Sequence, residues 1–121
     1  MAAVIEECAR GPVVASDLFG YGYGTALVDF LTQKPLVRPV WIITNPPFRL
    51  GIEFTLHALT LASEGVAMLA RTQWIETIAR YEKLFRDRPP ALYAPFVERV
   101  PMVKGQWDPD ASTATSYAWF V

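Results

Sequence analysis

Residues 41–48, with the sequence Trp-Ile-Ile-Thr-Asn-Pro-Pro-Phe, restrict the fold of this chain more than any other stretch. The aromatic and β-branched residues at 41–43 are typical of a strand that is buried on both faces. Pro46 has no N–H for a sheet, so the strand is predicted to end near Thr44. Pro46 and Pro47 fix their own φ and restrict the residue before them. We therefore expect Asn45 and Phe48 to be presented from a rigid turn.

The chemistry of this turn suits a planar amine. The side-chain carbonyl of Asn45 and the backbone carbonyl of Pro46 can together accept both hydrogens of one exocyclic amine. The ring of Phe48 offers a face on which a nucleobase can stack. The alternative is a strand-ending turn in which the protein itself satisfies Asn45.

Length and composition bound the fold and exclude several classes of site. A chain of 121 residues with 52% hydrophobic and 19% charged residues is expected to form one globular core. Its net charge of -1 gives no overall attraction to nucleic acid. Between positions 71 and 104, however, there are seven basic residues and only four acidic ones. Cys8 and His57 are the only residues of their kinds, so we expect no disulfide and no metal site.

The amino-terminal residues argue against export. Glu6 and Glu7 stand where a signal peptide needs basic residues followed by an apolar run. No uninterrupted apolar run approaches about 18 residues, the length that spans a bilayer. The sequence thus predicts a soluble, cytoplasmic protein with no membrane partner.

Periodicity and turn residues predict alternating helices and strands. The order typical of an α/β fold follows from this alternation. Helices are expected over residues 2–9, 25–31, 51–63 and 74–85, the last with Thr72 as its cap. Strands are expected over residues 13–15, 41–44, 66–69, 91–97 and 113–121, and a loop over residues 100–111.

The turn at residues 45–48 resembles motif IV, Asn/Asp-Pro-Pro-Tyr/Phe, of the S-adenosylmethionine-dependent amino-methyltransferases, above all the adenine-N6 DNA methyltransferases. Residues 80–90, 98–105 and 115–121 resemble small phage- and prophage-type members. The order of elements is similar to the second half of a class I methyltransferase domain. This resemblance implies a three-layer, Rossmann-like α/β fold with a mostly parallel sheet and a carboxyl-terminal antiparallel hairpin.

The resemblance also implies a role for particular residues. A target adenine in DNA would be held by its N6 amine and methylated with S-adenosylmethionine as the cofactor. The expected catalytic residues are Asn45, Pro46 and Phe48; the expected cofactor-binding residues are Asp17, Asp29 and Phe30; the expected substrate-binding residues are Pro47, Arg49 and Lys104. For Asp17 the alternative is the cap of a turn or helix.

The chain departs from the family at its start. In the family, a strand and a glycine-rich loop that wraps the cofactor precede the first helix, and residues 1–12 contain no Gly-x-Gly. We therefore interpret residues 1–121 as a single truncated methyltransferase-like domain, in which cofactor binding is weakened or lost. Two alternatives remain, a non-catalytic interaction module and a methyltransferase that acts on a glutamine side chain of a protein.

The missing strand leads to a prediction for the sheet. Its neighbours are expected to close the gap in the order 13–15, 41–44, 66–69, 113–121 and 91–97, the last strand being antiparallel to its neighbour. If they do not close it, the apolar strand at residues 41–43 is expected to be covered by a second copy of the chain, as a homodimer.

Overall fold

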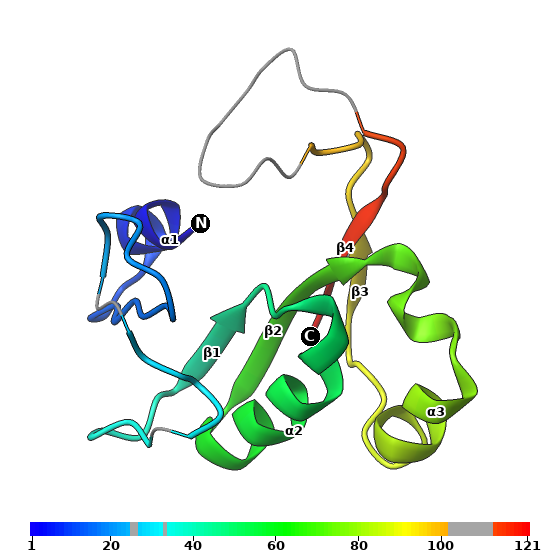
Figure 1. Cartoon of the computed structure of the whole chain (residues 1–121), viewed down its shortest axis with the longest axis horizontal. Coiled ribbons are helices and arrows are strands. Elements are labelled where there is room, and N and C mark those ends of the chain that lie inside the picture. Colours follow the sequence, from blue (N-terminus) through cyan, green and yellow to red (C-terminus); the bar gives the residue numbers. More distant parts are fainter. Residues whose placement is uncertain (25–26, 33, 102–112) are drawn as a thin grey trace. The chain divides into compact units, whose positions relative to one another are not determined.

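The computed structural model describes residues 1–24, 27–32, 34–101 and 113–121 of the chain (Figure 1). It divides into two compact units, Met1–Lys34 and Pro35–Val121, which are described separately. Lys104 and most of the loop predicted at 100–111 lie outside the described residues.

Among its described residues, the first unit has a helix followed by bends and turns. Helix α1, Ala2–Cys8, confirms the predicted helix, and the N–H of Ala9 closes it on the carbonyl of Ile5 at 2.8 Å. The strand predicted at residues 13–15 is wrong, because these residues form no ladder and Val14 is 89% exposed. Pro12, directly before this segment, has no backbone N–H to donate to a neighbouring strand. In the described sheet, no strand pairs with residues 13–15.

The second unit is built on a four-stranded sheet with the order β1-β2-β4-β3. Its strands are β1 (Trp41–Thr44), β2 (Gly65–Arg71), β3 (Tyr93–Pro95) and β4 (Tyr117–Phe120). The predicted order of these four strands is confirmed, as is the antiparallel pairing of the last two. The predicted mostly parallel sheet is wrong: β1 and β2 are parallel, but β4 runs antiparallel to both β2 and β3.

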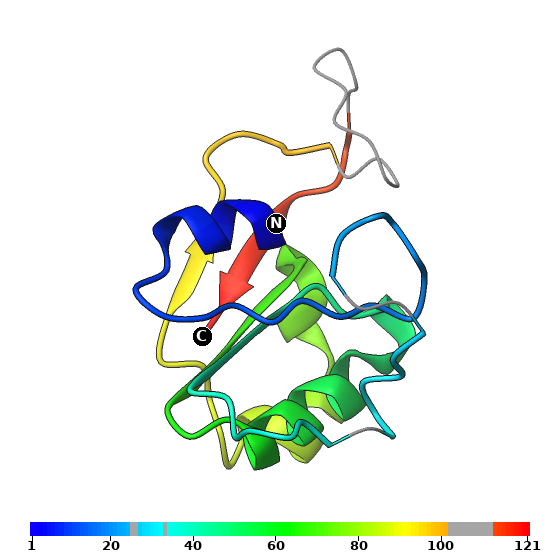
Figure 2. The same ribbon diagram turned by 90° about the vertical axis from the view of Figure 1, so that its left-hand side faces the viewer.

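Helical segments pack on one face of this sheet (Figure 2). After the short turn η1, Phe48–Leu50, helix α2 spans Gly51–Leu61 and confirms the predicted helix. The buried positions of α2 are the small residues Gly51, Thr55 and Ala58, whereas Leu56 is 37% exposed. The core cluster joins the sheet to the helical layer and consists of Met68, Ala70, Trp74, Leu84, Phe85, Ala118 and Phe120, with Ile52 and Leu59 packed against it.

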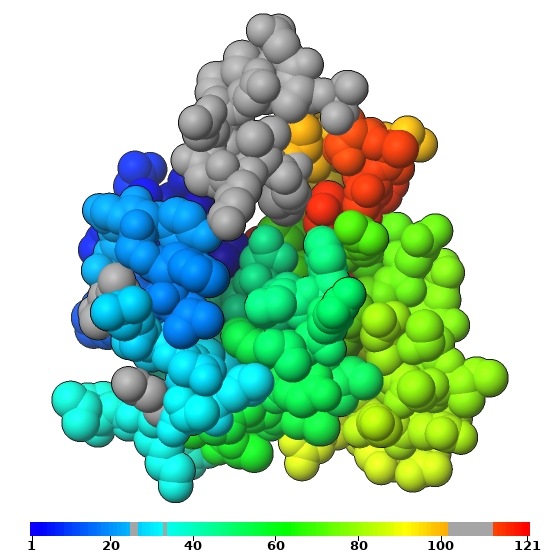
Figure 3. Space-filling view, viewed as in Figure 1, coloured from blue at the N-terminus to red at the C-terminus, as the bar shows by residue number. Residues whose placement is uncertain are grey.

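The helix predicted over residues 74–85 is interrupted. The structure has a 3₁₀ turn η2 (Thr72–Glu76), a short helix α3 (Ile78–Arg80) and a π-helical turn η3 (Tyr81–Phe85). The break falls at Thr77, whose backbone is extended and whose hydroxyl accepts the N–H of Arg80 at 3.4 Å. Thr77 therefore caps the helix in place of Thr72. Figure 3 shows the surfaces of α2 (green) and α3–η3 (yellow-green) side by side.

Strand β1 lies at the edge of the described sheet and is less buried than predicted. Trp41 is 47% exposed and Ile43 is 38% exposed, while Ile42 and Thr44 are partly buried. The indole ring of Trp41 lies directly over Gly65, its partner in β2, where a side chain would clash with it. The expectation of a strand covered on both faces is thus wrong for β1.

Candidate functional site: the turn after β1

The Asn-Pro-Pro-Phe turn follows the last residue of β1 directly. Pro46 is buried and anchors the turn, whereas Asn45, Pro47 and Phe48 are exposed. The carbonyl of Pro47 accepts the N–H of Leu50 at 2.9 Å, which closes the turn η1 before α2 begins. Pro46 is buried between the exposed side chains of Asn45 and Phe48, so it attaches the turn to the protein while Asn45 remains accessible.

The side chain of Asn45 makes no hydrogen bond to any residue that the structure describes. Its amide therefore keeps its carbonyl oxygen, an acceptor with two lone pairs, for another molecule. Within the described ranges, the alternative in which the protein satisfies Asn45 is not what the geometry shows.

Phe48 is held from one side by a residue of the neighbouring strand. The guanidinium carbon of Arg71 lies over the Phe48 ring, 4.1 Å from its centroid. This separation is well within the range of a cation–π interaction, which extends to about 6 Å. The ring is still 47% exposed, so it is both supported and accessible.

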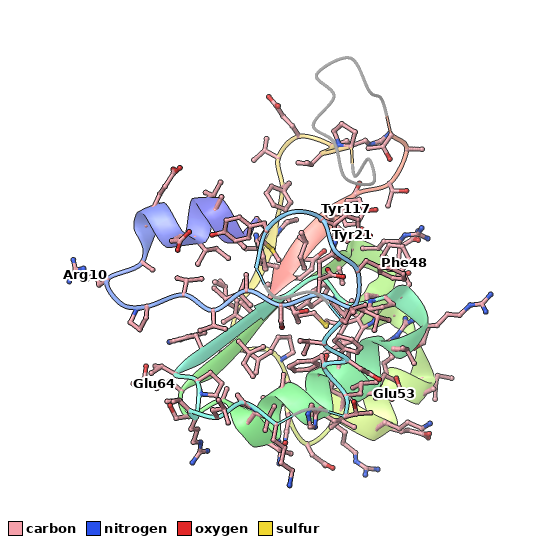
Figure 4. The ribbon with its side chains drawn as sticks, turned by 60° about the vertical axis from the view of Figure 1, so that its left-hand side comes forward. Arg10, Tyr21, Phe48, Glu53, Glu64 and Tyr117 are labelled. Carbon is pink, nitrogen blue, oxygen red and sulfur yellow. The ribbon has the colours of Figure 1, made fainter. Side chains whose placement is uncertain are left out.

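The register of the parallel pair explains why Arg71 reaches Phe48. Thr44, the last residue of β1, pairs with Met68, and β2 continues beyond that point to Arg71. Arg71 is thus placed beside the turn that follows β1, at the end of the sheet where β4 begins with Tyr117. Figure 4 shows Phe48 and Tyr117 at this end of the sheet.

A second contact joins the same two segments. Gly51, the first residue of α2, lies against the buried indole of Trp74, which follows Arg71 by three positions. One turn further along α2, the hydroxyl of Thr55 donates to the carbonyl of Gly51 at 2.6 Å and lies 2.9 Å from the sulfur of Met68. The first turns of α2 are therefore packed onto β2 and onto the segment that follows it.

The described site residues that were predicted are divided between the two units. Asn45, Pro46, Pro47, Phe48 and Arg49 lie in this turn, in the second unit. The three residues predicted to bind the cofactor, Asp17, Asp29 and Phe30, belong to the first unit. Arg71 was not predicted as a site residue. The sequence signal for it was its place directly after the apolar residues 66–70, because the carboxyl ends of parallel strands meet at one edge of a sheet.

Two of the residues expected to bind the cofactor form hydrogen bonds within their own turns. Asp17 does not follow a strand, and its Oδ1 accepts the N–H of Phe19 at 2.9 Å. Asp29 likewise accepts the N–H of Leu31 at 3.0 Å. Both carboxylates cap local turns, which confirms the alternative interpretation of Asp17. A direct contact of Asp17, Asp29 or Phe30 with S-adenosylmethionine stays a prediction, and no chemical step is derived through that cofactor.

An apolar cavity of about 100 Å³ lies elsewhere in the second unit. It is lined by core residues, including Thr55, Met68, Trp74 and Phe85, with Arg88 among the residues around it. None of the turn residues 45–49 lines it, so it is separate from the candidate site. Among the described residues no group of three or more histidine, cysteine, aspartate or glutamate side chains is placed to hold a metal ion.

Comparison with known proteins gives no match: no family model, curated protein or solved structure matches the sequence or the fold. In the ranges that the structure describes, no helix has both the length and the apolar character to cross a membrane.

Proposed function

We propose that this chain carries the substrate-binding half of an S-adenosylmethionine-dependent adenine-N6 DNA methyltransferase and binds an adenine that has left the base stack. The observation that carries the proposal is the exposed amide of Asn45, which has no hydrogen-bond partner among the described residues. It lies at the carboxyl end of a parallel strand and three positions before the accessible ring of Phe48. Methyl transfer requires a bound cofactor in addition, and its contacts with Asp17, Asp29 and Phe30 stay a prediction. The proposal places the protein in the cytoplasm.

The proposed binding mode uses three groups of the turn. Asn45 Oδ1 and the carbonyl of Pro46 accept the two hydrogens of the adenine N6 amine, and the base stacks on Phe48. Two accepted hydrogen bonds leave more electron density on the amine nitrogen, which is the atom that the family methylates. The adenine is extruded from its duplex or single-stranded at the outset, since neither its amine nor its face is accessible in a stacked pair.

The experiment compares oligonucleotides that differ only at the target amine. Affinity is measured for a strand with one adenine among thymines and for the same strand with N6,N6-dimethyladenine, which has no amine hydrogen to donate. We expect about tenfold weaker binding of the dimethyl strand, since a net hydrogen bond contributes about 0.5–1.5 kcal/mol. Asn45→Ala should remove this discrimination, and Asn45→Asp, which keeps an acceptor, should retain part of it. Equal affinity of the wild-type protein for both strands would overturn the proposal.

A second candidate function follows from the turn-capping roles of Asp17 and Asp29. Because both carboxylates accept backbone N–H groups of their own turns, the chain also fits a base-binding module without catalysis. Calorimetry with S-adenosylmethionine separates the two functions. Heat of binding that saturates at one cofactor per chain favours the methyltransferase, and its absence together with adenine discrimination favours the module.

A further inference from the structure

We infer that Arg71 positions the Phe48 ring and binds the phosphate of the nucleotide whose base stacks on that ring, so that the two side chains form a site for one nucleotide. This inference rests on the proposed function and adds to it a contact with the phosphate of the bound nucleotide. It is drawn from the contact between Arg71 and Phe48, which the family resemblance did not include.

The first step concerns the two faces of the ring. Arg71 occupies one face, with its guanidinium carbon 4.1 Å from the ring centroid. The residue nevertheless remains 47% exposed, so part of its surface is accessible to a ligand. The pair therefore offers one stacking surface and fixes its orientation, as expected for a site that takes a single base.

The second step concerns the hydrogen-bond donors of Arg71. A guanidinium has five N–H donors in its own plane, and a cation–π contact uses its face and leaves these donors available. Arg71 is exposed, and its side chain makes no ion pair or hydrogen bond within residues 1–24, 27–32, 34–101 and 113–121. A phosphate or a carboxylate takes two such donors side by side, and a nucleotide that stacks on Phe48 brings a phosphate.

The third step concerns local charge. Arg49 follows Phe48 directly in the sequence and is also exposed, so a second arginine accompanies the Arg71–Phe48 pair in a chain whose net charge is only -1. A glutamine side chain has neither a phosphate nor an aromatic face. The combination of ring and arginines therefore favours a nucleotide over a protein substrate.

The experiment removes the phosphate charge and the arginine separately. The probe is the strand with one adenine among thymines, labelled with fluorescein, and it carries either a normal phosphate or a neutral methylphosphonate next to the adenine. Fluorescence anisotropy gives the affinity over a range of salt concentrations. The variants are Arg71→Ala and Arg71→Lys. The control is Arg86→Ala, another exposed arginine, whose described partner is Asp87.

We expect Arg71→Ala and the methylphosphonate each to weaken binding by about tenfold, the size of a hydrogen bond between charged groups. Applied together they should weaken it by little more than either alone, because both remove the same contact. Arg71→Ala should also reduce the slope of log affinity against log salt by about 0.7, the value for one phosphate of a single strand. Arg71→Lys should keep most of the salt slope while losing part of the affinity, and Arg86→Ala should change neither.

Additive effects of Arg71→Ala and the methylphosphonate would overturn the inference, as would an unchanged salt slope. The proposed function would survive that result as long as Asn45→Ala still abolished the discrimination against dimethyladenine. If Arg71→Ala fails to fold, the methylphosphonate effect on the wild-type protein and on Arg71→Lys still decides the matter, since no loss of affinity with the neutral linkage contradicts a phosphate contact.

Discussion

Gly51 lies so close to Trp74 that a Cβ on this glycine would be 2.8 Å from the indole Nε1 and 3.3 Å from Cε2. The contact joins the first residue of α2 to the segment that follows β2. Because Phe48 and Arg71 each precede this contact by three positions, the absence of a side chain at residue 51 helps to place both.

Gly51→Ala should destabilise the protein although alanine is the better helix former. Overpacking a buried site costs about 1–3 kcal/mol, whereas the gain in helix propensity is about 1 kcal/mol. Urea unfolding followed by tryptophan fluorescence measures the difference in the second unit, which contains all four tryptophans. Gly11→Ala, at a glycine of the first unit where a Cβ meets nothing within 4 Å, is a control that should leave this transition unchanged. A Gly51→Ala variant as stable as the wild type would show that Trp74 moves freely.

Arg38→Ala should destabilise helix α2 by about 1 kcal/mol. Arg38 donates from Nε to the carbonyl of Leu61 and from Nη2 to that of Ala62, both at 3.2 Å. These carbonyls end the helix and have no partner within it, so the arginine satisfies them and its charge opposes the helix dipole. Thermal unfolding of Arg38→Ala and Arg38→Lys measures the effect. The stability of Arg38→Lys should lie between that of the wild type and that of Arg38→Ala. Equal stability of all three proteins would contradict this role of Arg38.

The phenol of Tyr23 should titrate above the ordinary tyrosine value of 10.0. Its hydroxyl donates a hydrogen bond to Glu6, which raises the pKa of Tyr23, and the negative charge of Glu6 raises it further. The protonated phenol is therefore favoured in the folded protein. Its contribution to stability is complete below pH 10 and is lost as the pH rises through the raised pKa.

The change in ultraviolet absorbance with pH, recorded for the wild type and for Tyr23→Phe, isolates this phenol among the five tyrosines. Glu6→Gln should return the pKa of Tyr23 toward 10.0, since it removes the charge and weakens the acceptor. A difference titration centred at or below 10.0 in the wild type would contradict the hydrogen bond as the cause.

The parts of the fold that were predicted correctly depend on local chemistry. Pro46 ends β1 whatever its neighbours in the sheet are, because a proline has no N–H to donate. The helical spacing of Ile52 and Leu59 predicts the face of α2 that packs against the core. The predictions that failed depended on neighbours. Residues 13–15 have strand composition without a partner strand, and Thr77 interrupts a periodic pattern because it caps the next helix.

The same distinction applies to the site. The turn at Asn45 could be predicted because prolines restrict the backbone around them. The contact between Arg71 and Phe48 could not, since it depends on the register of β1 against β2 and on how far β2 extends beyond it. The apolar run 66–70 places Arg71 at the end of β2, but it does not give the register of β1 against β2.

The exposed edge of β1 leads to the last prediction, which concerns assembly. Among the described strands, β1 pairs with β2 alone, so the backbone donors and acceptors on its other side have no strand partner in this sheet. Trp41 and Ile43 are both partly exposed on this apolar strand. An apolar edge of this kind is a template for another strand, and a second copy of β1 offers the same surface for symmetric pairing. We therefore expect a homodimer joined through β1.

Sedimentation velocity over a range of protein concentrations tests this prediction. Ile43→Lys should shift the wild-type dimer to monomer, because a charged residue at an edge strand opposes pairing. Leu56→Lys on α2 is a matched control, since Leu56 is 37% exposed and Ile43 is 38% exposed. A wild-type protein that stays monomeric at every concentration, or an equal response to the two lysine variants, would rule out assembly through β1.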